Sequence, residues 1–210
     1  MFFNNITPVV KNLIILNVAM WVITTILVPG LWQELSIYYP ETESFRPYQI
    51  ATYMFLHDAS SIFHILFNMM FLAFAGSRVE HLWGAQRFLF YYLFCGVAAL
   101  VLHFGMIFYQ VHYQGMPLAA AEYPMLGASG AVYGVIGAFG FLFAEETIQL
   151  MFPPIPMKIK YLVMLMVGGQ LMSGFGGGGD GIAHLAHASG ALFGLLLIFY
   201  WNTGGKLGRF

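Results

Sequence analysis

Hydrophobic residues occur along this chain in six long runs, and polar segments or segments rich in proline and glycine separate them. The runs cover about 12–29, 62–77, 88–109, 125–144, 159–174 and 181–201. A helix needs ~20 mostly apolar residues to cross the ~30 Å hydrocarbon core of a bilayer. Each run is therefore predicted to be a membrane-spanning helix. Segment 30–61 is too mixed to span, and its tryptophan and tyrosine residues suit the lipid–water interface. We expect it to form a first loop at that interface.

The composition supports this interpretation. Hydrophobic residues make up 60% of the chain and charged residues only 8%, whereas soluble domains are about 25% charged. A net charge of -1 offers no basic surface for nucleic acid, so we expect no nucleic-acid partner. The sequence predicts one domain over residues 1–210, an all-α membrane protein built as a bundle of six transmembrane helices.

The basic residues predict the orientation of the bundle. With the N-terminus in the cytoplasm, seven of the eight basic residues fall on the cytoplasmic side, where lysine and arginine concentrate in membrane proteins. They are Lys11, Arg78, Arg87, Lys158, Lys160, Lys206 and Arg209; only Arg46 falls outside. Both termini are therefore predicted to be cytoplasmic.

Three polar residues occupy matching positions in this topology. His64, Ser129 and His187 each lie near the beginning of a run that crosses from the outside inward. All three are therefore expected at a similar depth in the outer half of the membrane. Polar side chains inside a membrane are costly and mark functional sites.

The serine and the histidine of the last run suit nucleophilic chemistry. Ser129 follows Gly127-Ala128 at the predicted start of a helix, where free N–H groups and the helix dipole stabilise negative charge. His187 could act as the general base that a serine hydroxyl needs. The alternative is a helix-capping serine in a glycine-rich packing seam, and the short motif alone favours that alternative.

Paired glycines predict how these residues meet. Gly130-x3-Gly134 and Gly190-x3-Gly194 are small-residue motifs that allow two membrane helices to approach closely. Each motif begins just after its polar residue. Packing of the fourth run against the sixth would therefore bring the serine and the histidine together.

Three more side chains fit around this pair. Tyr133 lies one helical turn after Ser129 on the same face and could pack beneath the His187 ring, although an ordinary packing role fits its spacing equally well. His64 and Asn68 are four residues apart, can both donate hydrogen bonds, and could stabilise an oxyanion. A structural His–Asn pair is the alternative for these two.

A metal site is the other chemistry that the histidines suggest. His64, His184 and His187 are available, but zinc proteases of the H-E-x-x-H type place a glutamate between their histidines. The stretch His184-Leu185-Ala186-His187 has none. We expect no metal and no cofactor.

Together these motifs resemble the rhomboid family of intramembrane serine proteases. The resemblance rests on His64-x3-Asn68, on Gly127-Ala128-Ser129-Gly130 with Tyr133, and on His187-x2-Gly190-x3-Gly194. Phe45-Arg46-Pro47-Tyr48-Gln49 and Glu80 with Gly84 also fit the family. The match covers nearly the whole chain as a six-span core. One departure is Ser189-Gly190, where the family sometimes has two glycines.

The resemblance implies a Ser–His dyad without an acidic third member. Ser129 would be the nucleophile and His187 the general base, while His64, Asn68 and the backbone N–H of Ser129 would line the oxyanion hole. Tyr133 would support His187. Gly127 and Gly130 leave room for a tight turn and for close approach of a substrate, and Gly190 with Gly194 allows close packing. The fifth span, rich in glycine at 168–169 and 174–179, would be the mobile element past which a substrate helix enters from the bilayer.

The expected substrates are transmembrane proteins, cut near the outer ends of their helices. Two other functions stay open: a catalytically inactive rhomboid-like protein that binds membrane clients, and a small transporter. The presence of both serine and histidine counts against the first, and the lack of carboxylates at span centres counts against the second. Compact size and charge pattern predict a multi-pass protein of a bacterial plasma membrane.

Overall fold

A computed structural model describes residues 6–150, 154–175 and 181–203. The chain is mostly helical. Its elements are α1 (Pro8–Val22) with the π-helical turn η2 (Ile23–Leu27), α2 (Leu31–Leu35), α3 (Gln49–Thr52), the 3-10 helix η3 (Tyr53–Phe55), α4 (Ile62–Phe71) with the π-helical turn η4 (Leu72–Gly76), α5 (Ser77–Trp83), α6 (Ala85–His112), the 3-10 helix η5 (Leu118–Ala121), α7 (Ser129–Leu142), α8 (Ile159–Phe175) and α9 (Gly181–Thr203), with strands β1 (Thr147–Gln149) and β2 (Pro156–Lys158).

Within the described parts of the chain, four helical segments are long and apolar enough to cross a membrane: Pro8–Leu27, Ile62–Trp83, Ala85–His112 and Ala183–Thr203. Two shorter apolar helices, Ser129–Leu142 and Ile159–Gly174, coincide with the fourth and fifth hydrophobic runs. The protein is therefore a helical, multi-pass membrane protein. Six as the number of spans, and the cytoplasmic position of both termini, stay predictions.

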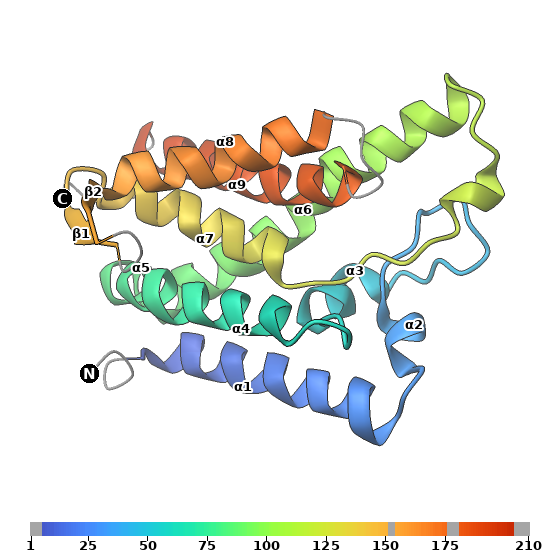
Figure 1. Ribbon diagram of the computed structural model, residues 1–210, viewed down its shortest axis with the longest axis horizontal. Coiled ribbons are helices and arrows are strands. Elements are labelled where there is room, and N and C mark those ends of the chain that lie inside the picture. Colours follow the sequence, from blue (N-terminus) through green and yellow to red (C-terminus); the bar gives the residue numbers. More distant parts are fainter. Residues whose placement is uncertain (1–5, 151–153, 176–180, 204–210) are drawn as a thin grey trace.

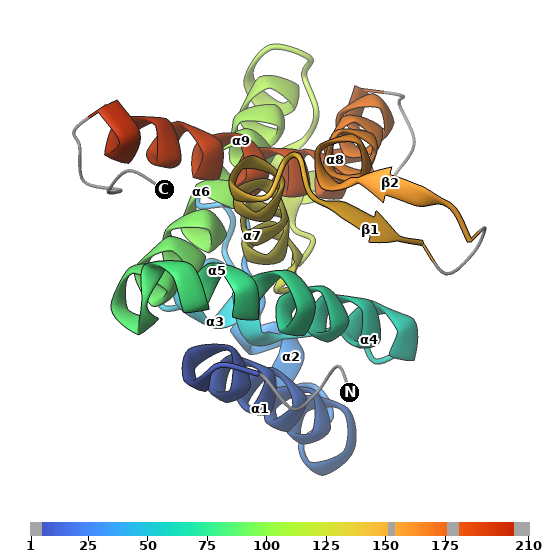
Figure 2. The same ribbon diagram turned by 90° about the vertical axis from the view of Figure 1, so that its left-hand side faces the viewer.

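Helix α7 is the centre of the bundle. Figure 2 shows it surrounded by α4, α6, α8 and α9, with α1 on the outside of α4 and α5. The helix begins at Ser129, four residues after the start of the hydrophobic run at 125. Its 14 residues span roughly 21 Å at ~1.5 Å per residue, less than the ~30 Å core of a bilayer. Its first turn is therefore expected below one membrane surface.

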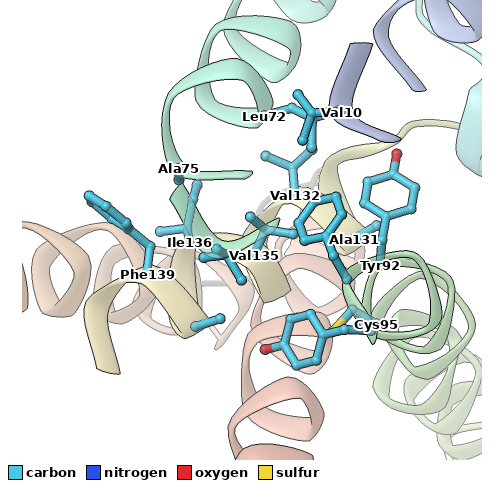
Figure 3. Packing of buried hydrophobic residues seen from close by; sticks show 14 of the residues in the cluster. Val10, Leu72, Ala75, Tyr92, Cys95, Ala131, Val132, Val135, Ile136 and Phe139 are labelled. Carbon is cyan, nitrogen blue, oxygen red and sulfur yellow. The ribbon is translucent and has the colours of Figure 1, made fainter. Parts of the chain in front are cut away.

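Small side chains and aliphatic residues fill the space around α7. Figure 3 shows Val132 of α7 next to Leu72 of η4 and Val10 of α1, all of them buried. On another side of α7, the Tyr91 hydroxyl of α6 donates a 2.9 Å hydrogen bond to the carbonyl oxygen of Gly134. Lipid tails are as apolar as these side chains, so close packing and such hydrogen bonds, rather than the hydrophobic effect, hold the helices together.

The first loop is folded onto the bundle. The Tyr53 hydroxyl donates a 2.5 Å hydrogen bond to the carbonyl oxygen of Gly96 on α6. Ile37 forms an antiparallel bridge with Met125, the residue at which the chain approaches α7. Segment 30–61, predicted only as an interfacial loop, thus contains three short helices and fixes the segment that leads into Ser129.

One buried carboxylate fixes the beginning of α1. Glu80 of α5 is 4% exposed and accepts hydrogen bonds from the backbone N–H groups of Val9 and Val10, at 3.0 and 2.9 Å, and from the Thr7 hydroxyl. The first N–H groups of a helix have no partner within the helix, and a negative charge there is stabilised by the helix dipole. Glu80 therefore ties α1 to α5.

A two-stranded hairpin between α7 and α8 is a feature that the hydrophobic pattern did not predict. Strands β1 and β2 pair antiparallel, at the end of the bundle where α1 begins (Figure 1). Glu145 accepts hydrogen bonds of 2.6 and 2.5 Å from Lys158 and Lys160. These two partners lower the pKa of Glu145 to about 2, so the hairpin is closed by a charged cluster at neutral pH.

Candidate active site

The first turn of α7 and the beginning of α9 bring a serine and a histidine into contact. Ser129 Oγ lies 2.7 Å from His187 Nε2, and both side chains are half-buried. Ser129 is the first residue of its helix, and no side chain caps that helix start. The oxygen of Ser129 therefore lies beside backbone N–H groups that have no partner within the helix.

Close approach of α7 and α9 depends on glycine. A Cβ atom on Gly190 would overlap the carbonyl oxygen of Gly130. One turn further along α9, a Cβ atom on Gly194 would overlap the Tyr91 hydroxyl of α6. The contact of Gly190 is with the backbone of α7, so α9 could not carry a larger side chain at this position without moving away from α7.

Ser189 lies at the one position where the motif of the last hydrophobic run departs from a pair of glycines. Its side chain is fully buried, and its hydroxyl donates a 2.7 Å hydrogen bond to the carbonyl oxygen of Ala98 on α6. The substitution is therefore accommodated by a hydrogen bond between α9 and α6, one residue before the close contact of Gly190.

Tyr133 covers one face of the His187 ring. The two rings are stacked, with 4.8 Å between centroids and an interplanar angle of 7°. Because Tyr133 belongs to the same helix as Ser129, a single helix positions both the hydroxyl and the plane of the imidazole that faces it.

His64 approaches the serine from α4, across Gly127. A Cβ atom on Gly127 would lie 3.3 Å from Ser129 Oγ and 3.5 Å from His64 Nε2, so this residue borders both side chains. Its φ is +137°, a conformation that residues with a Cβ atom rarely adopt. Gly127 thus keeps open the space between His64 and Ser129.

Asn68 lies one turn further along α4, and its amide has another partner. Asn68 Nδ2 donates a 2.9 Å hydrogen bond to the backbone carbonyl of His64, and the residue is buried. The predicted pair of donors is therefore present on one helix, but the structure brings only the His64 ring next to Ser129.

Gln170 of α8 is part of this cluster, although the sequence reasoning did not identify it. Its Oε1 lies 2.7 Å from His187 Nδ1 and 2.7 Å from His184 Nδ1, while its Nε2 donates a 2.9 Å hydrogen bond to the Tyr133 hydroxyl. An amide side chain inside an apolar run is itself a sign of a polar contact within the membrane, and that sign could have identified it.

One cavity is lined by the serine–histidine pair, and a second one lies next to it on the side of His64. A small cavity of about 30 Å³ is lined by Tyr53, Gly127, Ser129 and His187 among others, which is enough room for a water molecule. A larger cavity of about 610 Å³ is lined by His64 and by loop residues of the first loop and of segment 124–126. Met125, Leu126 and Ala183 line both cavities.

His57 lies behind His64, in the loop before α4. The two rings are 5.2 Å apart between centroids, and His57 is 2% exposed. Burial, and then the neighbouring His64, lower the pKa of His57 to about 3. Among the described residues neither ring nitrogen of His57 has a hydrogen-bond partner, so this neutral ring packs against His64 without fixing it by a hydrogen bond.

Metal binding was predicted to be absent. Across residues 6–150, 154–175 and 181–203, no group of three histidine, cysteine, aspartate or glutamate side chains is arranged to hold a metal ion. His184 and His187 instead share the carbonyl oxygen of one glutamine. The absence of a metal and of a cofactor stays a prediction.

The fold and the site define a class: a multi-pass helical membrane protein with a serine–histidine pair inside its helical bundle. Comparison with protein families identifies the class more closely, because the Rhomboid domain matches residues 44–202. The chain therefore belongs to the rhomboid family, as its motifs predicted.

Individual relatives come from mitochondria and from bacteria. Rhomboid protein 1, mitochondrial, of Saccharomyces cerevisiae is 28% identical over 148 residues, which are 70% of this chain and 41% of the relative. The human presenilin-associated rhomboid-like protein, mitochondrial, is 28% identical over 145 residues, 67% of this chain and 35% of the relative. Rhomboid protease GluP of Bacillus subtilis is 34% identical over 77 residues, 37% of this chain and 12% of the relative. The chain thus spans less than half the length of these curated relatives.

Proposed function

We propose that this protein is an intramembrane serine endopeptidase, which hydrolyses peptide bonds in or near the transmembrane helices of other membrane proteins. The observation that carries the proposal is the 2.7 Å contact between Ser129 Oγ and His187 Nε2 inside a membrane-protein bundle. A hydroxyl at this distance from an imidazole nitrogen can transfer its proton as the oxygen attacks a carbonyl.

In the first step, Ser129 Oγ attacks the carbonyl carbon of the substrate peptide bond and His187 Nε2 takes the hydroxyl proton. The carbonyl oxygen becomes an oxyanion. Two donors flank the space beside Ser129: the His64 ring, across Gly127, and the free N–H groups at the start of α7. Donors aimed at a developing oxyanion contribute a large share of catalysis in acyl transfer.

In the second step, the C–N bond breaks and His187 returns the proton to the leaving amine. An acyl-enzyme ester on Ser129 remains. A water molecule in the small cavity next to Ser129 and His187 then gives a proton to His187 and attacks the ester carbon. The bond between that carbon and Ser129 Oγ breaks, the carboxylic acid leaves, and His187 returns the proton to Ser129 Oγ. The cavity supplies the water that hydrolysis inside a membrane requires.

The position of the larger cavity supports a substrate that enters as an extended segment of chain. The larger cavity of about 610 Å³ extends from His64 toward the first loop and can receive an extended segment of chain. A helix in lipid hides its carbonyl groups in its own hydrogen bonds, so a substrate must unwind first. Transmembrane segments weakened by glycine or proline are therefore the expected substrates.

The topology is part of the proposal. Residues 1–210 would form one six-span protease domain, with both termini in the cytoplasm and segment 30–61 at the outer interface. Two of the three relatives described above are mitochondrial and one is bacterial. A bacterial plasma membrane stays a prediction from size and charge pattern.

The test combines active-site labelling with a cleavage assay. Purified protein is treated with a fluorophosphonate and, separately, with a transmembrane substrate in proteoliposomes, next to Ser129→Ala, His187→Ala and a chelator-treated sample. We expect labelling and cleavage that resist the chelator and disappear in both variants. Full activity of a folded Ser129→Ala protein would contradict the proposal. Binding of substrate helices without any turnover would favour a client-binding protein instead.

A further inference from the structure

One glutamine on α8 connects three members of the cluster around the dyad. Gln170 Oε1 is 2.7 Å from Nδ1 of His187 and 2.7 Å from Nδ1 of His184. Gln170 Nε2 donates to the Tyr133 hydroxyl at 2.9 Å. A carbonyl oxygen can only accept hydrogen bonds, so each histidine must donate from Nδ1 to form these contacts.

We infer that Gln170 is a positioning residue of the dyad, which holds His187 in the tautomer with the proton on Nδ1 and leaves Nε2 free to accept the proton of Ser129. The inference rests on the proposed protease function, because it assigns Gln170 a role through His187. In other serine enzymes an aspartate fills this position and fixes the histidine tautomer. Here an uncharged amide occupies it.

The orientation of the Gln170 amide is itself determined by its neighbours. The Tyr133 hydroxyl binds the nitrogen of the amide and thereby turns the oxygen toward the histidines. Tyr133 also stacks on the His187 ring. The amide and the phenol therefore restrain the same imidazole in two ways: one selects the protonated nitrogen and the other sets the ring plane.

The location of Gln170 on α8 makes this contact dependent on the position of that helix. α8 lies at the edge of the bundle beside α7 and α9 (Figure 2). Near the beginning of α8, Val163 contacts Gly140 of α7: a Cβ atom on Gly140 would lie 2.7 Å from the Val163 side chain. Helices α7 and α8 therefore pack tightly there. Around Gly168 and Gly169 there is open space. Among the described residues of α8, Gln170 alone hydrogen-bonds through its side chain to α7 or α9.

A displacement of the later part of α8 would therefore remove the acceptor from His187. Access of a substrate past α8 and the alignment of the dyad would be coupled through one side chain. Helix α8 would have to return before His187 takes the proton of Ser129, because a base that is misoriented transfers protons inefficiently even when it stays near the nucleophile.

Replacement of Gln170 by glutamate and by methionine separates positioning from packing. Gln170→Met keeps the shape but removes the acceptor; we expect kcat to fall about 10- to 100-fold with KM changed less than about 2-fold. Gln170→Glu keeps an acceptor and adds a charge that favours the protonated imidazole. We expect it to retain most of kcat and to move the acid limb of the pH–rate profile upward by about 1 to 3 pH units.

The groups that face His187 are the same in every variant. They are His184 on the same helix, Ser129 and Tyr133 on α7, and His64 on α4; α6 faces α9 further along, with Tyr91 and Cys95 near Gly194. Leu171→Met, at the neighbouring position of α8, is the matched control and is expected to leave kcat and the pH profile unchanged. A Gln170→Glu protein with an unmoved acid limb would overturn the inference.

A second measurement does not depend on activity. Nitrogen-15 NMR of histidine-labelled protein, with His187→Ala used to assign the signals, reports which nitrogen of His187 carries the proton. We expect Nδ1–H in the wild type and a mixture of tautomers in Gln170→Met. A wild-type ring protonated on Nε2 would overturn the inference even if the enzyme is active. If the wild type neither labels nor cleaves, the proposed function fails, while the NMR result still decides whether Gln170 fixes the tautomer.

Discussion

The phenol ring of Tyr133 lies parallel to the imidazole of His187, with 4.8 Å between the ring centroids and 7° between the ring planes. The stack joins the helix that carries Ser129 to the helix that carries the base. It leaves the edge of the imidazole free, so that Nε2 faces Ser129 and Nδ1 faces Gln170.

The aromatic ring of Tyr133 should therefore matter more than its hydroxyl. Tyr133→Phe keeps the stack and loses only the contact with Gln170, so we expect kcat to fall less than about 10-fold, the equivalent of one hydrogen bond of ~1 kcal/mol. Tyr133→Ala removes the stack and leaves a cavity beside the base, and we expect a loss of roughly 100-fold. Cleavage kinetics in proteoliposomes measure both, with thermal unfolding as the check on folding. Equal activity of the two variants would show that the ring does not orient His187.

The two polar side chains of α4 should contribute unequally. His64→Ala removes a ring that borders the space beside Ser129, and the loss of an oxyanion donor typically lowers kcat about 100- to 1,000-fold. Asn68→Ala removes a hydrogen bond to the His64 carbonyl, which is worth about 1 kcal/mol, so we expect roughly a 5-fold effect. A larger effect of Asn68→Ala than of His64→Ala, both measured as kcat on one transmembrane substrate, would place the principal donor on Asn68 instead.

The sequence indicated the serine–histidine contact without settling it, because the short serine motif alone also fits a capping serine. A glycine-flanked serine at a helix start and the two small-residue motifs are readable without knowledge of the fold. The helix does begin at Ser129, and of the two roles that spacing left open for Tyr133 the structure shows the one in which its ring stacks on His187.

Other features depend on the rotation of one helix against another, which spacing does not determine. Gln170 points at His187 because α8 packs on α7 through Val163 and Gly140, a contact between residues distant in the sequence. The Asn68 amide has two N–H hydrogens, and spacing alone could not tell that one of them binds the His64 carbonyl. The β hairpin and the π-helical turns η2 and η4 also have no hydrophobic periodicity that distinguishes them from ordinary loops and helices.

The contact of Gly190 with Gly130 predicts a strong effect of a single methyl group. Gly190→Ala would place a Cβ atom against the Gly130 carbonyl oxygen and force α7 and α9 apart, at a cost of about 1–3 kcal/mol. We expect a lower unfolding temperature and loss of fluorophosphonate labelling. Gly105→Ala is the matched control: it lies in α6 with open space around it, and alanine favours a helix by up to ~1 kcal/mol over glycine. If Gly190→Ala behaved like this control, the close approach of α7 and α9 would not be needed.

Burial of His57 predicts how stability depends on pH. Burial and the nearby His64 lower its pKa from 6.5 to about 3, so below pH 6.5 the unfolded chain binds a proton that the folded protein does not. The free energy of unfolding should therefore decrease as the pH falls from about 6.5 toward 3, by at most ~1.4 kcal/mol per pH unit from this one group. Asp58 acts in a lower window, because the Ser60 backbone N–H lowers its pKa below 3.8.

The variant His57→Gln isolates this contribution, since every other titrating group is shared with the wild type. Unfolding of both proteins in detergent is followed between pH 7.5 and pH 4 by thermal melting. We expect the wild type to lose stability faster than the variant on acidification and the two curves to be parallel above pH 7. Parallel curves throughout the range would mean that the folded protein accepts a proton on His57 as readily as the unfolded chain does. The ring would then be in contact with water from the large cavity that it lines with His64, rather than held dry behind it.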